Sequence, residues 1–359
     1  MPDAKEHMSF LLIVAVLLAF LSTPAATPPS PQTATTYPRD RDAQCAACRI
    51  NLEPIAEIGS PRGTPGAICE KSAFLAANDA TGTFFVAPVC EENAVGVYGP
   101  DGSYIDSLTH EVFSSVRRLW YFEDHLHAFN LALQHAVLTS EGKLVRVVAN
   151  PGLPHDVVFL GGGNGTVQNL ILHSPEAVGL PLHHVNEEGR IQNSFGMQRA
   201  QYRADQPSQL ARSLARSGES EVSAAPISPY RIESWDLDGE LVQALTRQPA
   251  WFVAEPQALA ARVVSVRIDD AGRLWTMSLV LVDPGARLRP RPWGTEEATR
   301  YADTMIEVLV PAQDQTALVS SLRSDLILTR WVGDMTYSFH DQEDGTVLLK
   351  VWKVTLDEA

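Results

Sequence analysis

The chain has 359 residues, of which 45% are hydrophobic and 20% are charged, and its formal net charge is −15. This composition is that of a globular protein, and the length suits an architecture that grows by adding units better than one compact core. The negative charge argues against a nucleic-acid partner, because phosphate binding needs a basic face. It also disfavours adhesion to anionic lipid, so no membrane contact is expected beyond the N-terminal segment.

Residues 1–26 are predicted to be a secretory signal peptide. The unbroken apolar run Phe10–Leu21 is followed by small residues up to Ala25 and Ala26. A short apolar run with this ending is typical of a signal peptide, and a membrane span needs about 20 residues. We therefore expect a periplasmic or secreted protein, with an uncleaved N-terminal anchor as the alternative. Residues 27–44, rich in Pro and Thr, are expected to form a disordered tether.

The chain has four cysteines, Cys45, Cys48, Cys69 and Cys90. An even number of cysteines in an exported protein indicates disulfides. Residues 68–77 and 83–91 have the pattern of two strands joined by a turn, and Cys69 and Cys90 lie symmetrically about it. Cysteines that face each other across a hairpin are close enough to be bridged. We therefore predict the disulfides Cys69–Cys90 and Cys45–Cys48.

The Cys45-x-x-Cys48 spacing also occurs in haem, zinc and thiol-exchange sites. A haem site would need a histidine where Arg49 stands. A zinc site would need a second pair of ligands at similar spacing, and a thiol-exchange site would need a helix after the second cysteine. A structural disulfide is the main prediction, and a redox role or a metal site is the alternative.

Six glycine-containing turns recur along the chain, each between two strand-like runs: Asp101-Gly102, Glu141-Gly142, Glu188-Gly189, Asp238-Gly239, Ala271-Gly272 and Asp344-Gly345. An apolar residue stands two positions after every one of these glycines. Asp-Gly is a typical hairpin turn, and a repeat of about 40–50 residues is typical of propeller blades. We therefore predict an all-β fold over residues 45–359, a six-bladed β-propeller with four-stranded antiparallel blades. Five or seven blades are the alternatives.

The blades are expected at 69–108, 116–149, 156–196, 210–245, 263–322 and 325–356. The spacing of 33 and 73 residues on either side of Gly272 departs from the other spacings, so this glycine is assigned to an inner turn of the fifth blade. That blade is then interrupted by a Pro/Arg loop, Asp283–Arg300. The strand-like segment Arg49–Ser60 is expected to complete the last blade beside residues 347–356, because a borrowed N-terminal strand closes a propeller.

Two units of the chain, residues 83–108 and 230–245, resemble six-bladed propeller repeats of the NHL and TolB-like kind. Such repeats pair an inner strand with an outer strand that ends in an aspartate–glycine turn. From Cys45 to Leu356 the chain is similar to uncharacterised exported bacterial propeller proteins. The resemblance implies the fold, and it brings no catalytic motif with it.

Histidines are the first candidates for chemistry. His125 and His127 are weak metal-ligand candidates, because residues two apart on a strand share a face. His155 opens the next blade near the same ring of loops, whereas His183 and His184 point to opposite faces. Histidines on loops and solvent faces are more common than ligands, so no cofactor is predicted.

Acidic side chains are the second candidates. A calcium or zinc site in the central channel would need carboxylates and amides from several blades. The available residues are Asp79, Glu123, Asp124, Asn193, Asp269 and Asp270. Acidic residues at β-turns are usually turn formers. The glycine-rich segment Gly161–Gly165 lacks the strand–helix context of a phosphate loop, and Trp120, Trp235, Trp275, Trp331 and Trp352 are expected to pack between blades.

The main functional prediction is a non-enzymatic propeller that binds a protein or a small ligand over one end of its channel. Loops from all blades meet there on a rigid platform. The alternative is a metal-dependent hydrolase or lyase of the lactonase type, with its site in the channel. Catalytic residues are not assigned.

Overall fold

The computed structural model describes residues 35–36, 43, 45–172, 177–197, 207–252, 261–282, 302–310 and 317–358. All of them belong to the unit Ala34–Ala359. The predicted signal peptide lies outside the described residues, as does most of the predicted tether. Within that tether, β1 (Thr35–Thr36) pairs in parallel with a strand of the fourth blade. None of the helices in the described part of the chain has the length and apolar character of a membrane span.

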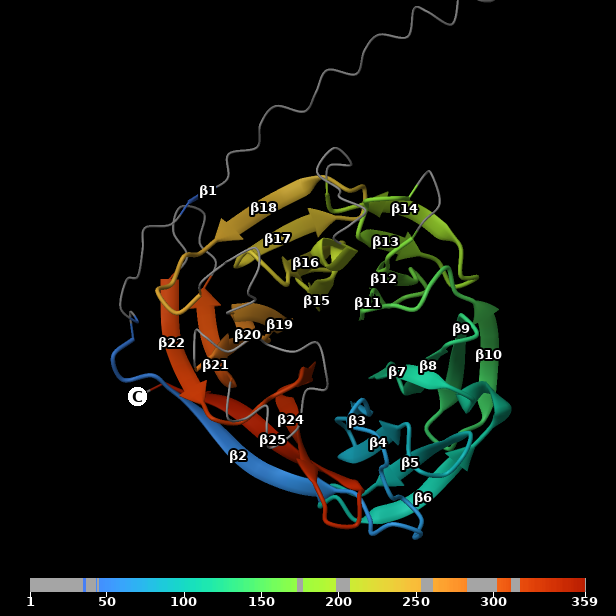
Figure 1. The fold of residues 1–359 in the computed structure, drawn as a ribbon. Coiled ribbons are helices and arrows are strands. Elements are labelled where there is room, and N and C mark those ends of the chain that lie inside the picture. Colours follow the sequence, from blue (N-terminus) through green and yellow to red (C-terminus); the bar gives the residue numbers. More distant parts are fainter. Residues whose placement is uncertain are drawn as a thin grey trace, which may run out of the picture. The chain divides into compact units, whose positions relative to one another are not determined.

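The first three blades each consist of four consecutive strands that pair in chain order (Figure 1). The first contains β3 (Phe74–Asn78), β4 (Thr83–Ala87), β5 (Ala94–Tyr98) and β6 (Tyr104–Thr109). The second contains β7 (Val116–Phe122), β8 (His125–Asn130), β9 (Gln134–Thr139) and β10 (Leu144–Ala149). The third contains β11 (Asp156–Phe159), β12 (Thr166–Asn169), β13 (Leu182–Val185) and β14 (Ile191–Phe195). These agree with the predicted blades.

The fourth and fifth blades follow the same order. The fourth contains β15 (Arg212–Arg216), β16 (Glu221–Pro226), β17 (Arg231–Asp236) and β18 (Leu241–Thr246), with β1 outside β18. The fifth contains β19 (Ala261–Ile268), β20 (Leu274–Leu281), β21 (Ala302–Val310) and β22 (Ala317–Ser324). Gly272 lies in the turn between β19 and β20, which confirms that it belongs to an inner hairpin. The predicted interruption, residues 283–300, lies outside the described residues.

The sixth blade closes the ring as predicted. It contains β23 (Trp331–Val332), β24 (Met335–Asp341) and β25 (Val347–Asp357), and its outermost strand is β2 (Arg49–Ile58). The antiparallel register sets Ile50 against Leu356 and Glu57 against Lys350. Figure 1 shows β2 beside β25, so a strand that precedes the first blade in the sequence completes the last blade. The six-bladed, four-stranded β-propeller is therefore confirmed.

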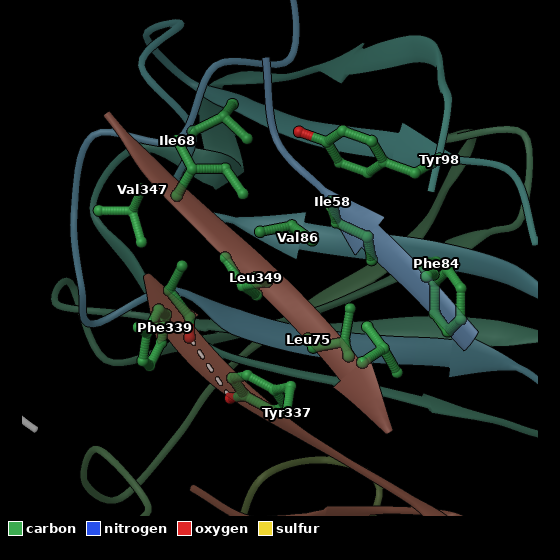
Figure 2. Close-up of a cluster of buried hydrophobic side chains, with 14 of the residues drawn as sticks. Ile58, Ile68, Leu75, Phe84, Val86, Tyr98, Tyr337, Phe339, Val347 and Leu349 are labelled. Atoms are coloured by element: carbon green, nitrogen blue, oxygen red, sulfur yellow. Dashed lines mark hydrogen bonds between the residues drawn. The ribbon is translucent and has the colours of Figure 1, made fainter. Parts of the chain in front are cut away.

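The core lies between neighbouring blades, because each sheet buries both faces. Figure 2 shows the cluster between the sixth and first blades, where Ile58 of β2 and Leu349 of β25 pack near Leu75 and Phe84. Ile58 and Leu349 are both fully buried. The hydroxyl of Tyr98, which also belongs to this cluster, donates to the carbonyl oxygen of Gly66 at 2.6 Å. The closure strand is thus held by side-chain packing as well as by its backbone ladder.

Two of the repeated glycines are needed because another blade touches them. A Cβ atom on Gly189 would lie 2.0 Å from the carbonyl oxygen of Ala149, at the end of β10. A Cβ atom on Gly102 would lie 2.2 Å from the carbonyl oxygen of Glu57 on β2. Both glycines also have a left-handed φ, +78° and +86°. The glycine turn of one blade therefore fits directly against the outermost strand of the blade before it.

The structure contains the disulfides Cys45–Cys48 and Cys69–Cys90. The strands of the first hairpin are shorter than expected, since β3 begins at Phe74 and β4 ends at Ala87. Cys69 and Cys90 therefore lie beyond the ladder, where the Cys90 backbone N–H donates to the carbonyl oxygen of Ala67 at 2.7 Å. The Cys48 carbonyl oxygen accepts from Ser320 Oγ of β22 at 3.1 Å, which ties the first disulfide to the fifth blade.

Candidate functional site

Two adjoining cavities lie among the inner strands of the propeller. The larger has a volume of about 1180 Å³ and includes Asn78, Phe122 and Phe159, from the ends of inner strands. The smaller has a volume of about 480 Å³ and is lined by the beginnings of inner strands. Asp156, Ser265 and Arg330 line both. The two cavities therefore meet at these three side chains.

Each of the six blades contributes to the smaller cavity near the start of its inner strand. In blade order the contributing residues are Phe74, Arg118, Asp156, Ser213, Arg262 and Arg330. We call this space the arginine cavity. Such a site arises directly from the ring, because the inner strands β3, β15, β19 and β23 contact their neighbours around the axis. Residues far apart in the sequence are thereby brought to one place.

The arginine cavity is strongly cationic although the protein is acidic. Among the described residues that line it, four are cationic and one is a carboxylate: Lys71, Arg118, Arg262, Arg330 and Asp156. Lys71 reaches out to Asp341, with 2.6 Å between its Nζ and the carboxylate oxygen. The three guanidinium groups thus share the described part of the wall with one carboxylate. An anion is the ligand that this charge distribution favours.

Arg118, on the cavity wall, is held in place by three contacts. Its Nε and Nη1 donate to the carbonyl oxygens of Pro154 at 3.0 Å and Arg117 at 2.8 Å, and its guanidinium lies 4.4 Å from the centre of the Phe74 ring. The ladder between β7 and β8 shifts register between Val116 and Arg118, a bulge of the kind that re-aims side chains beside functional sites. Burial, and then the nearby charge of Arg330, lowers the pKa of Arg118 to about 10.

Arg330 and Asp156 form an ion pair across the junction of the two cavities. Their nitrogen and oxygen atoms are 3.6 Å apart, and the guanidinium of Arg330 lies 4.9 Å from the Trp120 ring centre. Asp156 also accepts from Ser213 Oγ at 3.2 Å and from the Leu214 backbone N–H at 2.9 Å. These two hydrogen bonds fix the carboxylate, so its position does not depend on Arg330 alone.

Arg262 completes the cationic wall from the fifth blade. Burial lowers its pKa to about 9, so the side chain is still mostly cationic at neutral pH. A lowered arginine pKa means that the folded protein destabilises the charged form. The fold keeps these guanidinium groups in spite of that cost. Arginine forks match carboxylate and phosphate groups bidentately, so such an anion is the natural counterpart.

The acidic candidates from the sequence lie at the opposite end of the inner strands. Asp79, Asp269 and Asp270 line the larger cavity together with Asp334. Burial, and then the neighbouring carboxylate of Asp334, raises the pKa of Asp79. Asp269 accepts from Trp275 Nε1 at 2.8 Å and pairs with Arg273 at 2.7 Å. These contacts hold Asp269 as a structural residue of its turn.

The remaining polar candidates are spread over other turns and strands. Glu123 and Asp124 form the turn between β7 and β8, and Gly161–Gly165 form the turn between β11 and β12. Asn193 on β14 donates to the carbonyl oxygen of Leu237 at 3.1 Å. None of them lines the arginine cavity within the described part of the chain. The structure therefore brings Asp79, Asp269 and Asp270 to the larger cavity and leaves Glu123, Asp124 and Asn193 outside it.

The structure pairs His127 with His135, and not with His125. His127 Nδ1 lies 3.0 Å from Nε2 of His135, and its ring packs at 4.3 Å from that of Phe159. His125 Nδ1 instead lies 2.6 Å from the carbonyl oxygen of Glu123. Burial lowers the pKa of His127 to about 2 and that of His135 to about 3. Within the described ranges, no group of three His, Cys, Asp or Glu residues is placed to hold a metal ion.

The other histidines are separate from this pair. His183 Nδ1 lies 2.8 Å from Ser194 Oγ, and His184 Nε2 lies 2.9 Å from the carbonyl oxygen of Asn164. Burial lowers the pKa of His183 to about 4. His155 lines the arginine cavity rather than meeting His125 and His127.

The tryptophans pack largely as expected. Trp275 and Trp331 meet between the fifth and sixth blades with ring centres 6.0 Å apart, and Trp352 packs against the same cluster. Trp235 packs against Phe195 of the third blade. Trp120 contacts Phe159 of the third blade and also lies under Arg330 at the cavity junction. That second role is not visible in the sequence.

Sequence reasoning missed the three arginines of the cavity. Each belongs to a different blade, and no local motif surrounds it. The available signal was an arginine inside an apolar strand, as in Val116–Phe122 and Ala261–Ile268. A charged residue in such a run has to be buried or directed at the axis, where burial needs a compensating partner.

No protein-family model matches the chain, and no curated protein matches it. It is similar to a gluconolactonase from Xanthomonas campestris, with 11% identity over 87% of this chain and 92% of that one, at a TM-score of 0.45. It is also similar to virginiamycin B lyase from Staphylococcus aureus (10% identity, 84% and 99% coverage, TM-score 0.45). A third similar structure is the Swd1 β-propeller domain from Myceliophteria thermophila (12%, 85% and 100%, TM-score 0.46). These likenesses concern the propeller fold, and the NHL and TolB-like resemblance is not confirmed.

Proposed function

We propose that the protein is an exported ligand-binding propeller that takes up an anionic small molecule in the arginine cavity. The observation that carries the proposal is the gathering of Arg118, Arg262 and Arg330 in a cavity whose described residues include one carboxylate, in a protein of net charge −15. Export is supported by the apolar leader in the sequence and by the two disulfides, which are typical of oxidising compartments.

The energetics of the arginines support binding rather than a structural role. Burial disfavours the charged forms of Arg118 and Arg262, as their lowered pKa values indicate. An incoming carboxylate or phosphate reverses that effect, because an opposite charge within hydrogen-bond distance favours the guanidinium ion. The folded protein thus holds donors in place before the ligand arrives. Pre-organised donors reduce the entropic cost of binding.

The arginine cavity does not suit the metal-dependent alternative. The guanidinium groups of the arginine cavity repel a divalent cation, and Asp156 is the only carboxylate among the described residues of its wall. Calcium sites need about six oxygen ligands and catalytic zinc sites need three protein ligands. We therefore assign the arginine cavity to an anion.

Thermal unfolding in the presence of phenyl phosphate tests the proposal. At a phenyl phosphate concentration ten times the dissociation constant, binding stabilises the folded state by about 1.4 kcal/mol, which raises the Tm by roughly 2–4 °C. The Arg262→Met variant should lose this increase. The matched control is Arg323→Met, because Arg323 on β22 pairs with Asp303 outside the cavity. All samples are held at one ionic strength so that general screening is constant.

The two variants separate the possible results. The proposal is supported when the control keeps the ligand-induced increase and Arg262→Met loses it. It is contradicted when both variants keep the same increase, or when choline, a cation, stabilises the wild-type protein as much as phenyl phosphate does.

A further inference from the structure

The arginine cavity has an apolar side as well as a cationic one. Ile227, Val264 and Phe339 line it together with the guanidinium groups. Ile227 lies beside β19, since its carbonyl oxygen accepts from the Val263 backbone N–H at 3.0 Å. An inorganic anion would leave such a surface in contact with water. The apolar side therefore restricts the class of ligand further than the positive charge alone does.

A bulge in β19 places Val264 next to Arg262 on the cavity wall. The ladder between β19 and β20 pairs Val263 with Ser278 and then Ser265 with Met277, so Val264 is the extra residue. A regular strand would direct alternate residues to opposite faces. Because of the bulge, the run from Arg262 to Ser265 lines the cavity without interruption. Bulges next to binding sites commonly re-aim side chains in this way.

The size of the cavity also indicates a ligand larger than an inorganic anion. Its volume of about 480 Å³ falls within the range of about 300–1,000 Å³ that is typical of small-molecule sites. An inorganic oxyanion is only a few times the size of a water molecule, which occupies about 30 Å³ in the liquid. Most of the cavity would then be left to solvent.

We infer that the ligand is an organic anion, a carboxylate or a phosphate monoester attached to an aromatic or branched apolar body. Its charged group contacts Arg118 and Arg262, and its body packs against Ile227 and Val264. This inference rests on the proposed function, because it specifies the ligand of the same cavity. Burial of the body supplies affinity that a bare anion cannot obtain.

Calorimetric titration with two pairs of probes tests the ligand class. Phenyl phosphate is compared with methyl phosphate, and benzoate with acetate, at one ionic strength. Each pair keeps the charged group and changes only the apolar body. We expect the aromatic member of each pair to bind about tenfold tighter or more, since that factor corresponds to burial of a modest apolar area.

Substitutions in the apolar wall test where the apolar body of the probe binds. Ile227→Ala should reduce the affinity for phenyl phosphate several-fold and leave that for methyl phosphate unchanged. Val242→Ala is the matched control, because Val242 is 54% exposed on β18 of the same blade. It should change neither affinity.

The results distinguish a wrong ligand class from a wrong site. Equal affinities within each pair, with Arg262→Met still weakening both members, would overturn the apolar body and leave the anion site intact. No binding of any of the four probes would contradict the proposed function together with this inference. A loss of affinity in Val242→Ala equal to that in Ile227→Ala would also overturn the assigned wall.

Discussion

Two buried arginines show how the protein treats this residue type in different roles. Arg247 is part of the core between the fourth and fifth blades, where its Nη1 lies 2.5 Å from the carboxylate of Glu307. Tyr230 donates to the same carboxylate at 2.5 Å. Although burial lowers the pKa of Arg247, the Glu307 carboxylate raises it above its usual value. Arg118 has a lowered pKa instead, so its positive charge is not balanced to the same degree.

The buried histidines predict a loss of stability in mild acid. His127, His135 and His183 have pKa values of about 2, 3 and 4 in the folded state, because burial disfavours the imidazolium form. Their unfolded pKa is about 6.5, so below that pH the unfolded chain binds protons that the folded one does not. The free energy of unfolding should therefore fall as the pH decreases from 7 to 5, by about 2 kcal/mol for each histidine. Urea titrations at several pH values measure this decrease.

Single substitutions on β9 test whether the buried histidines cause this decrease in the free energy of unfolding. His135→Phe preserves the parallel stacking on Phe129, where the ring centres are 4.3 Å apart. The decrease between pH 7 and 5 should be smaller in this variant by about 2 kcal/mol. Leu138→Ala, a fully buried position on the same strand, should lower stability equally at every pH. A His135→Phe variant with the wild-type pH dependence would show that His135 does not titrate as argued.

At the scale of elements, the glycine turns join blades rather than only strands. Gly189 has a φ of +78° and touches the carbonyl oxygen of Ala149 in the preceding blade. Gly272 has a similar φ of +73°, but a Cβ atom there would meet nothing within 4 Å. A comparison of Gly189 with Gly272 therefore separates the energetic cost of the backbone conformation from that of the contact between blades.

Alanine substitutions at these two turns should differ in their effect on stability. Gly272→Ala should lower the free energy of unfolding by about 1–2 kcal/mol, the cost of a left-handed conformation. Gly189→Ala should lower it by at least about 3 kcal/mol, because the added methyl group also forces the two blades apart. Chemical denaturation of both variants gives the comparison. Equal losses would mean that the contact with Ala149 adds nothing.

At the scale of the whole molecule, the fold could be predicted from the sequence and the site could not. The glycine turns and alternating apolar runs are local signals, so they indicated six blades and a closing strand within Arg49–Ser60, which the structure places at Arg49–Ile58. The arginine cavity is lined by residues from all six blades, and those of different blades are tens of positions apart. Only the closed ring brings Arg118 and Arg330 together. The bulge at Val264, which sets the apolar wall, has no sequence signature either.

For the cysteines, the pairing could be predicted from the sequence but the extent of the neighbouring strands could not. The disulfide Cys69–Cys90 was predicted from a hairpin that continues through both residues, whereas the strands β3 and β4 stop before them. The symmetric placement of Cys69 and Cys90 about the turn indicated the right pair, because the two segments continue side by side beyond β3 and β4. Local symmetry thus predicted the contact, and the extent of the strands depended on packing that the sequence does not show.

The central claim is that the charge balance of the arginine cavity determines ligand binding. Asp156 is the carboxylate that opposes a bound anion, so Asp156→Asn removes its repulsion while the amide can still accept from Leu214. Calorimetric titration with phenyl phosphate at one ionic strength should therefore show affinity increased about tenfold in Asp156→Asn and decreased about tenfold in Arg118→Met. Equal affinities in the wild-type protein and both variants would contradict the account.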